Sequence, residues 1–194
     1  LTLNAGNRWE QQTGYTAEFL QGTVAASGEI SPEVAFELKN QWAPRVGLIS
    51  VGWMGKLHSK AYQAVPLVYP ELGIRTRLVH AADTAPDRGD YARDVLAYER
   101  GRLDYRAVLA DPDVDVVSIC APNLLHREIG VAAAEAGKPF WIEKPVGRDA
   151  VDTAAVAAAA AAAGVRTSIG YNYRHAPAVE RIRGVDSDYS IRAL

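Results

Sequence analysis

The segment from Val46 to Gly55 reads VGLISVGWMG, an apolar run followed directly by a turn with the spacing Gly-x-x-Gly. A short apolar run without alternation predicts a buried strand, and a helix is expected after the turn. A strand, a glycine turn and a helix in this order are typical of a phosphate-binding loop, because the helix N-terminus stabilises negative charge. The alternative is a tight turn that binds no ligand. The strand–turn–helix context favours the phosphate loop.

Each position of this loop has an expected role. Gly52 would let the backbone approach a pyrophosphate, and Gly55 would let the helix lie close to the strand. Ser50 stands where the usual pattern has its first glycine, and a serine disfavours the positive φ that a glycine can adopt there. Its hydroxyl could bond a phosphate or the backbone. We predict that Ser50, Gly52, Trp53, Met54 and Gly55 contact a cofactor.

Strands and helices are predicted to alternate from Arg45 onward. The expected strands are residues 46–51, 77–82, 114–120, 140–142 and 165–169, and most are apolar runs typical of parallel strands covered on both faces. The expected helices are residues 54–64, 87–97, 104–110, 124–136 and 149–163, the last ended by Gly164. This order predicts an α/β fold with a doubly wound parallel sheet and right-handed crossovers.

Composition and chain order divide the sequence into three parts. Residues 1–44 are polar, with candidate helices at 17–26 and 32–40, and form an N-terminal extension of unclear role. Residues 45–170 form the predicted nucleotide-binding domain, and residues 171–194 follow it. The first residue is Leu rather than Met, so the chain is interpreted as a fragment or as having a misplaced start.

Bulk properties exclude several classes of function. The 194 residues are 48% hydrophobic and carry a net charge of −2, which gives no indication of a nucleic-acid partner. The single cysteine, Cys120, excludes an internal disulfide and a multi-cysteine metal site and predicts a cytoplasmic protein. No apolar run is long enough to cross a bilayer, so no membrane partner is expected.

Asp83 follows the second predicted strand and adds a second cofactor signal. A carboxylate at this position can accept both ribose hydroxyls of NAD and would repel the extra phosphate of NADP. The alternative is a helix N-cap, because the residues that follow are typical of a helix start. Arg88 lies close enough in sequence to weaken the preference. We therefore predict NAD as the cofactor, with NADP as the alternative.

Further motifs follow in the order and spacing of one family. They are the segments Ser50–His58, Cys120–Asn123 with His126, Glu143–Pro145 and Gly170–Arg174, together with Asp83. From about Arg45 to Ile182 the chain resembles the glucose–fructose oxidoreductase, inositol dehydrogenase and rhizopine catabolism oxidoreductases (Gfo/Idh/MocA). The resemblance implies a Rossmann domain that holds NAD(P) and a C-terminal α/β domain that completes the substrate pocket and the oligomer interface. It also implies a homo-oligomeric dehydrogenase that transfers hydride at a secondary alcohol of a sugar or cyclitol.

The resemblance also implies roles for single residues. Lys144 is the expected catalytic residue, which bonds the substrate hydroxyl and helps to move its proton, with Glu143 beside it and the cofactor. The Lys144–Pro145 bond is a candidate for cis. The loop Ala121–Pro122–Asn123 is expected beside the nicotinamide ribose. His126 either contacts the cofactor or caps and packs its helix, and the sequence leaves both open.

Other motif residues are harder to interpret. Asn172 and Arg174 could contact cofactor or substrate, or could belong to a hydrogen-bonded linker. His58 is expected by the resemblance, and we interpret it as a structural residue of the first helix. Cys120 ends a buried strand and is interpreted as core rather than as a nucleophile.

The second domain of the family supplies an Asp and a downstream His, and no residue before Leu194 can be assigned to that histidine. His175 comes too early to be that histidine. We therefore expect the C-terminal substrate domain to be largely absent, with residues 171–194 as its hinge and start, and an oxidoreductase that is incomplete in this chain. The alternatives are a non-catalytic dinucleotide-binding module or remnant, and a small reductase that borrows catalytic groups from a partner subunit.

Overall fold

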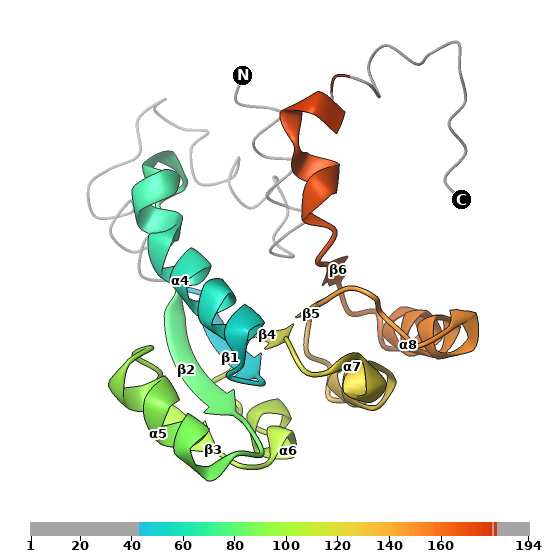
Figure 1. The fold of residues 1–194 in the computed structure, drawn as a ribbon, viewed down its shortest axis with the longest axis horizontal. Coiled ribbons are helices and arrows are strands. Elements are labelled where there is room, and N and C mark those ends of the chain that lie inside the picture. The colour runs from blue at the N-terminus through green and yellow to red at the C-terminus, as the bar shows by residue number, and fades with distance from the viewer. Residues whose placement is uncertain (1–42, 180, 182–194) are drawn as a thin grey trace, which may run out of the picture.

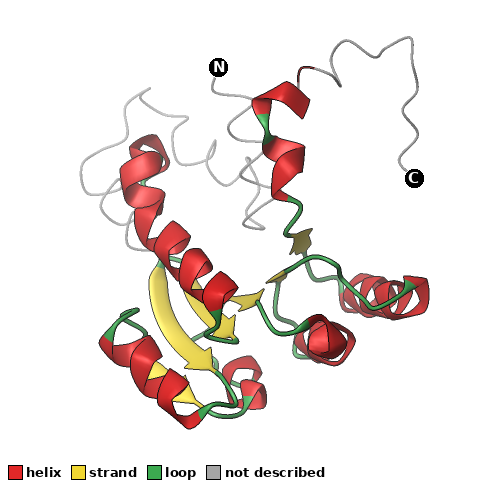
Figure 2. Cartoon of the chain, viewed as in Figure 1, coloured by secondary structure: helices red, strands yellow, loops and turns green. Residues whose placement is uncertain are grey.

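The computed structural model describes residues 43–179 and 181. The helices predicted at 17–26 and 32–40 lie outside the described residues. Within them, strands and helices alternate along the chain, as Figures 1 and 2 show.

A six-stranded parallel sheet forms the centre of the fold, with the strand order β3-β2-β1-β4-β5-β6. Its strands are β1 (Arg45–Ile49), β2 (Arg77–Ala82), β3 (Arg100–Arg102), β4 (Val116–Ile119), β5 (Phe140–Ile142) and β6 (Thr167–Ile169). The chain winds outward from β1 to β3 and then returns to add β4 on the other side of β1. This arrangement confirms the predicted doubly wound α/β fold.

Helices cover both faces of the sheet. They are α4 (Trp53–Val68), α5 (Pro86–Asp94), α6 (Tyr105–Leu109), α7 (His126–Glu135) and α8 (Ala150–Ala163), with short 3-10 helices η1 (Pro70–Leu72), η2 (Asn123–Leu125) and η3 (Asn172–His175). Figure 1 shows α7 and α8 side by side and α4 over the first strands.

Two apolar cores lie between these layers. One core contains the apolar side chains of β4 and β5 with those of α6, α7 and α8; Ile119, Ile129 and Ile142 are among its members. The other packs β1 and β2 against α5 and its following loop, with Leu48, Leu78 and Leu96 among its members. Burial on both faces explains why most strands are apolar throughout.

The last helix shows how the local sequence sets an element's ends. The N-cap Asp149 accepts a hydrogen bond from the amide of Asp152 at 2.8 Å. An alanine-rich stretch follows, and Gly164 ends the helix with φ of 64°. The predicted C-terminal glycine cap of this helix is confirmed.

Several predicted boundaries were wrong. β3 was not predicted, because its sequence Arg-Gly-Arg carries no apolar signal. α4 continues past its predicted end to Val68 and accommodates Pro66 in its last turn. α5 stops at Asp94, short of Ala97, which adopts a positive φ of 63°. β6 differs most, because all three of its residues are exposed rather than covered on both faces.

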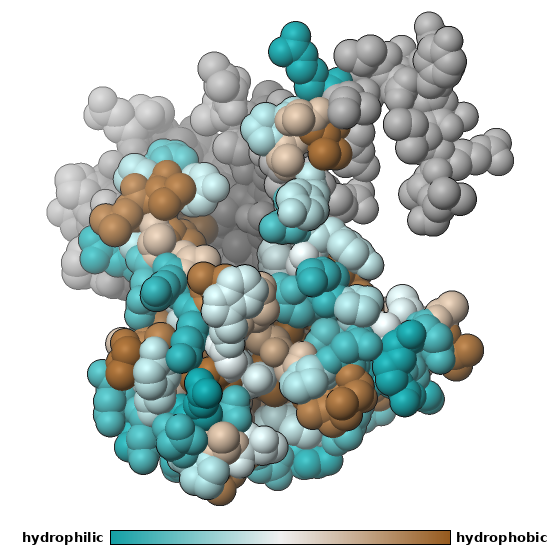
Figure 3. Space-filling model, viewed as in Figure 1, coloured by the Kyte–Doolittle hydropathy of each residue, from teal (hydrophilic) through white to brown (hydrophobic). Residues whose placement is uncertain are grey.

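The surface in Figure 3 is mixed, with apolar groups gathered at the end of α4. The exposed large apolar side chains of that region are Leu67, Val68 and Tyr69. No helix within the described ranges has the length and apolar character needed to cross a membrane.

Candidate functional site

The carboxyl ends of the parallel strands meet at one edge of the sheet, where ligands bind in open α/β folds. Loops after β1, β2, β4, β5 and β6 all carry predicted site residues. These residues are Ser50, Gly52, Trp53, Met54, Gly55, Asp83, Ala121, Pro122, Asn123, His126, Glu143, Lys144, Asn172 and Arg174. The fold thus brings segments that are distant in sequence to a common edge.

The turn between β1 and α4 is open toward this edge. Gly52 is the N-cap of α4, and among the described residues no side chain caps this helix end. The first intrahelical bond runs from the Lys56 amide to the Gly52 carbonyl at 3.0 Å. The amides of the preceding helical residues therefore lack intrahelical partners and, with the helix dipole, suit an anion.

The two glycines of the turn differ in their surroundings. A Cβ at Gly55 would collide with the carbonyl oxygen of Ser50, so this position allows α4 to lie against the end of β1. A Cβ at Gly52 would have only the Ser50 hydroxyl nearby, at 3.7 Å. Gly55 is therefore required by packing, whereas Gly52 leaves open space at the helix N-terminus.

Ser50 adopts a left-handed conformation with φ of 76°, although the sequence analysis noted that serine disfavours the positive φ open to a glycine at this position. Its amide donates to the Ala82 carbonyl at 2.8 Å, and this bond joins the ends of β1 and β2. The neighbouring Val51 amide donates to the carboxylate of Asp83 at 2.7 Å. Hydrogen bonds to the adjacent strand thus hold a conformation that is unfavourable for serine.

Asp83 organises the loop beside the glycine turn. One carboxylate oxygen accepts from the Val51 amide, and the other accepts from the Ala85 amide at 3.0 Å. The N-cap of α5 is Ala85, so Asp83 precedes the cap rather than forming it. Each carboxylate oxygen keeps further acceptor capacity, so the side chain can still accept ribose hydroxyls. Arg88 lies nearby and donates to the Val51 carbonyl at 3.3 Å.

A pocket of about 320 Å³ opens next to Asp83. Apolar side chains dominate one part of it, and Asp83, Thr84 and Asp104 supply polar groups. Its walls come from the ends of β1 and β2, the segment before and within α6, and the start of the β4–α7 connection: Ile49, Ser50, Ala82, Asp83, Thr84, Leu103, Asp104, Tyr105, Arg106, Ala121, Pro122, Leu125 and Ile129. A flat apolar ring attached to a polar sugar matches this lining.

Tyr105 and Arg106 form part of the pocket wall, and both side chains bond Glu128 of α7. The Tyr105 hydroxyl donates to Glu128 at 2.7 Å, and burial together with this carboxylate raises the pKa of Tyr105 to about 12. The Arg106 guanidinium lies 4.6 Å from the centre of the Tyr105 ring and also bonds Glu128. Neither residue was singled out from the sequence, because this role depends on the position of α6 beside the sheet edge.

The loop after β4 is tied to the loop after β5. Asn123 donates from its side-chain amide to the Pro145 carbonyl at 2.7 Å. His126 is fully buried, with its ring nitrogens 2.7 Å from the Pro145 carbonyl and 2.8 Å from the Ala121 carbonyl. These contacts give His126 a packing role between the two loops. A direct contact with a cofactor stays a prediction that this burial does not favour.

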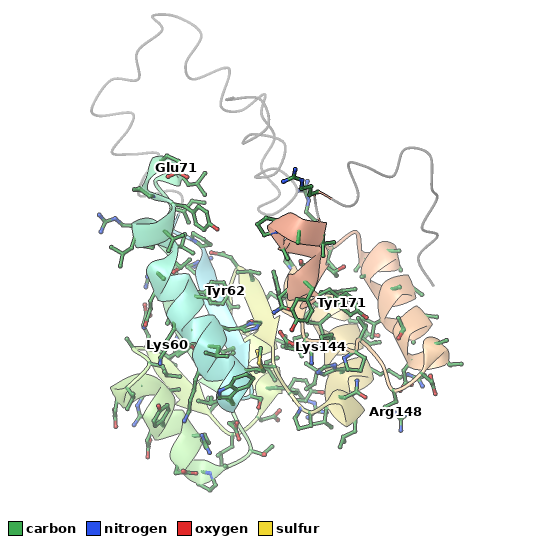
Figure 4. All side chains as sticks on the ribbon, turned by 45° about the horizontal axis from the view of Figure 1, so that its top comes forward. Lys60, Tyr62, Glu71, Lys144, Arg148 and Tyr171 are labelled. Atoms are coloured by element: carbon green, nitrogen blue, oxygen red, sulfur yellow. The ribbon has the colours of Figure 1, made fainter. Side chains whose placement is uncertain are left out.

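Glu143 and Lys144 follow β5 and have opposite environments. Glu143 is 7% exposed, whereas Lys144 is exposed at the sheet edge (Figure 4). The Lys144–Pro145 peptide bond is cis, as the sequence suggested. β5 and β6 pair in register through Ile142 and Ile169, so the loop that starts with Glu143 lies next to the segment that follows β6.

His58 joins this region to α4, a contact that the sequence interpretation missed. Its Nε2 lies 3.0 Å from a Glu143 carboxylate oxygen and its Nδ1 lies 2.6 Å from the Ser118 hydroxyl. The position of His58 after the glycine turn was noted, but no sequence signal identified Glu143 as its partner.

The remaining predicted residues lie at the rim. Trp53 is 73% exposed at the start of α4. Asn172 is exposed and Arg174 lies in η3, beyond the end of β6. Burial raises the pKa of Cys120 to about 12, which agrees with its interpretation as a core residue rather than a nucleophile.

Comparison with known proteins identifies the family. Residues 44–171 match the family described as "Oxidoreductase family, NAD-binding Rossmann fold". The chain belongs to this NAD-binding oxidoreductase family. The family assignment agrees with the resemblance inferred from the motifs and with NAD as the expected cofactor.

Relatives within this oxidoreductase family include sugar and cyclitol dehydrogenases. Levoglucosan dehydrogenase of Pseudarthrobacter phenanthrenivorans is 39% identical over 137 residues, covering 69% of this chain and 34% of that protein. Inositol 2-dehydrogenase of Rhizobium meliloti is 29% identical over 144 residues, covering 74% of this chain and 41% of that protein.

Solved structures of the family share the fold. A levoglucosan dehydrogenase in complex with NADH and levoglucosan is 36% identical, with a TM-score of 0.69, over 73% of this chain and 40% of that one. An NAD-binding oxidoreductase from Klebsiella pneumoniae is 34% identical with a TM-score of 0.70, over 74% of this chain and 38% of that one. The chain therefore spans well under half the length of the relatives that it matches.

Proposed function

We propose that the carboxyl edge of the sheet binds NAD(H) and that this chain supplies the cofactor-binding part of a polyol dehydrogenase. The observation that carries this proposal is the uncapped N-terminus of α4 directly beside Asp83 and an apolar pocket of about 320 Å³. A phosphate group, a ribose and an aromatic base need these features in this order.

The arrangement of the edge sets the direction of the bound dinucleotide. The adenosine belongs in the pocket beside β2, with its ribose at Asp83, and the pyrophosphate belongs at Gly52. The pocket reaches from Asp83 after β2 to Ala121 and Pro122 after β4, so we assign the nicotinamide end to the far side of that loop, toward the loop after β5. Asn123 and Glu143 are the residues that we assign to that end, with Ala121 and Pro122 at its border.

Lys144 is the group that we assign to proton transfer. It is exposed at the end of β5, next to the buried carboxylate of Glu143. NAD held at this edge would supply the hydride acceptor for a carbinol carbon, and the Lys144 amine would bond the hydroxyl on that carbon and help to remove its proton. Asn172 and Arg174, which follow the adjacent strand β6, are proposed to contact the cofactor or the substrate.

The substrate class is proposed from the relatives, which act on levoglucosan and inositol. A sugar or cyclitol secondary alcohol fits an exposed lysine beside a nicotinamide. This chain spans 34% and 41% of those two relatives. The competing proposal is therefore a module that binds the dinucleotide without turnover.

The proposal is tested by titrating NADH and NADPH into the purified chain while following nucleotide fluorescence. Saturable NADH binding is expected, and Asp83→Asn should weaken it about tenfold through loss of a charged ribose acceptor. Asp90→Asn is the matched control, since Asp90 bonds Arg93 on the surface of α5. Absence of binding at millimolar nucleotide would contradict the proposal.

A second measurement separates the two forms of the proposal. The chain is incubated with NAD⁺ and a panel of sugars and cyclitols, and NADH formation is followed. Turnover that disappears in Lys144→Met supports the dehydrogenase. Saturable NADH binding without turnover of any panel member supports the non-catalytic module.

A further inference from the structure

His58 connects the phosphate-binding helix to the acidic residue beside Lys144. It lies in the second turn of α4, and its two ring nitrogens contact side chains of two different strand segments, Ser118 in β4 and Glu143 after β5. An ionised carboxylate only accepts hydrogen bonds, so Nε2–H donates to Glu143. In the neutral imidazole, Nδ1 then carries no proton and accepts from the Ser118 hydroxyl.

The order Ser118–His58–Glu143 resembles a hydrolytic triad only in composition. Ser118 is fully buried in the centre of the sheet, where no substrate can reach its hydroxyl. The hydroxyl also donates its proton to the imidazole in this arrangement. The hydrogen bonds of this network therefore run from Ser118 through His58 to the Glu143 carboxylate, and their role is structural.

The surroundings leave this carboxylate little freedom. The His58 ring meets Trp141 edge-on, with the ring centres 5.9 Å apart and an interplanar angle of 88°. On the other side, a Cβ at Gly170 would lie 2.5 Å from a Glu143 carboxylate oxygen. Glu143 is thus held between a side chain of α4 and the backbone that follows β6.

We propose that His58 is a positioning residue that fixes Glu143, and through it the nicotinamide end of the site, relative to the pyrophosphate loop. The inference rests on the proposed function. Gly52 and Gly55 lie at the start of α4, and His58 lies one turn further along the same helix. A single helix therefore contacts the centre of the proposed cofactor and, through one hydrogen bond, the residue beside Lys144. His58 does this without touching the cofactor itself.

The test compares NADH with ADP-ribose, which keeps the adenosine, the pyrophosphate and a ribose but lacks nicotinamide. His58→Leu should weaken NADH about tenfold, the loss of one charge-assisted bond, and should weaken ADP-ribose less than about twofold. His58→Gln keeps an N–H donor for Glu143 and should recover most of the NADH affinity.

Ser59→Ala is the matched control on the same helix. Ser59 is as buried as Ser118 and bonds the Gly55 carbonyl and the Tyr98 hydroxyl, with no contact to Glu143. It should leave the ratio of the two affinities unchanged. Equal weakening of NADH and ADP-ribose by His58→Leu would overturn the inference, because that is what a merely structural role predicts.

Two further measurements keep the inference testable if His58→Leu does not fold. Gly170→Ala places a methyl group where the Glu143 carboxylate lies, and it should lower the NADH affinity selectively with His58 intact. Long-range ¹H–¹⁵N spectra of the wild-type chain should show the Nε2–H tautomer of His58. An Nδ1–H tautomer would overturn the inference. If the wild-type chain binds neither ligand, the proposed function fails as well.

Discussion

The two sides of the sheet hold their parts of the site in different ways. On the β2 side, backbone amides make the contacts: the amides of Val51 and Ala85 bond Asp83, and the Ser50 amide joins β1 to β2. On the β5 side, side chains make them: His58 bonds Glu143, and Asn123 bonds the Pro145 carbonyl. A pocket lies between the end of β2 and the loop after β4, whereas the β6 edge is exposed.

This difference indicates which part of the site is rigid. Backbone hydrogen bonds between paired strands change only if the strands separate, so the proposed adenosine end is set by the fold itself. The opposite end depends on rotatable side chains and borders exposed residues such as Tyr171, which follows β6 as Lys144 follows the neighbouring strand β5. Adenosine binding should therefore tolerate side-chain changes that disturb the nicotinamide end.

The largest expected effect comes from breaking the backbone contact on the rigid side. Gly55→Ala places a Cβ against the Ser50 carbonyl and should lower the free energy of unfolding by about 3 kcal/mol. NADH binding should be lost with it. Urea denaturation and nucleotide titration measure both effects.

Gly52→Ala is the control for that prediction. Its Cβ has open space, so stability should change by less than about 0.5 kcal/mol. NADH binding should nevertheless weaken, because the methyl group occupies the space proposed for the pyrophosphate. A Gly55→Ala protein as stable as the wild type would contradict the assignment of Gly55 to packing.

Amide hydrogen exchange should also distinguish the exposed β6 edge from the centre of the sheet. β1 lies between β2 and β4, whereas β6 is the outermost strand with exposed side chains. Amides in β6 should therefore exchange about 100-fold faster than hydrogen-bonded amides in β1, because local opening at an edge exposes little apolar surface. Mass spectrometry or NMR of exchanging amides measures the ratio. Equal protection of the β6 and β1 amides would contradict the proposed difference in rigidity between the two parts of the site.

A buried histidine makes the β2 side sensitive to pH. Burial lowers the pKa of His80 from 6.5, although its hydrogen bond to Asp111 at 2.7 Å opposes the shift. Nearby charges on Arg100 and Arg102 also disfavour its protonation. Below pH 6.5 the unfolded chain therefore binds a proton that the folded chain resists. Stability should fall as the pH decreases through this range.

The loss should be no more than about 1.4 kcal/mol between pH 7.5 and 5.5, which is the limit for one proton that only the unfolded chain binds. His80→Gln keeps an N–H for Asp111 and does not titrate. Its unfolding free energy should change less over the same range. Identical pH dependence in both proteins would show that another group is responsible.

The smallest effect concerns the positive φ of Ser50. Ser50→Gly should raise the free energy of unfolding by about 0.5 kcal/mol, since relief of the left-handed conformation exceeds the entropy that glycine adds to the unfolded chain. Ala97→Gly is the matched control, because Ala97 has φ of 63° on an exposed loop. If the unfolding free energy rises less in Ser50→Gly than in Ala97→Gly, the difference is attributed to loss of the Ser50 hydroxyl, which lies 3.5 Å from an Asp83 carboxylate oxygen.

The sequence predicted the elements whose physics is local. Apolar runs identified β1, β2, β4 and β5. Asp83 and Lys144 were placed at one edge because the carboxyl ends of parallel strands meet there. β3 was missed because Arg100 and its neighbours carry no apolar signal. The bond from His58 to Glu143 was missed for a different reason. It depends on how α4 crosses the sheet, and no spacing along the chain encodes that contact.

The central claim is that the dinucleotide lies along the carboxyl edge with its adenosine on the β2 side. Amide chemical-shift mapping by ¹H–¹⁵N NMR tests it most directly, with ADP-ribose added first and NADH second. ADP-ribose should shift the amides of residues 51–55, 83–85 and 103–106 together with those of Ala121 and Asn123, and NADH should add shifts at Glu143, Lys144 and Val146. Shifts confined to the opposite edge, around Arg45 and Asp113, or no shifts at millimolar ligand, would contradict the account.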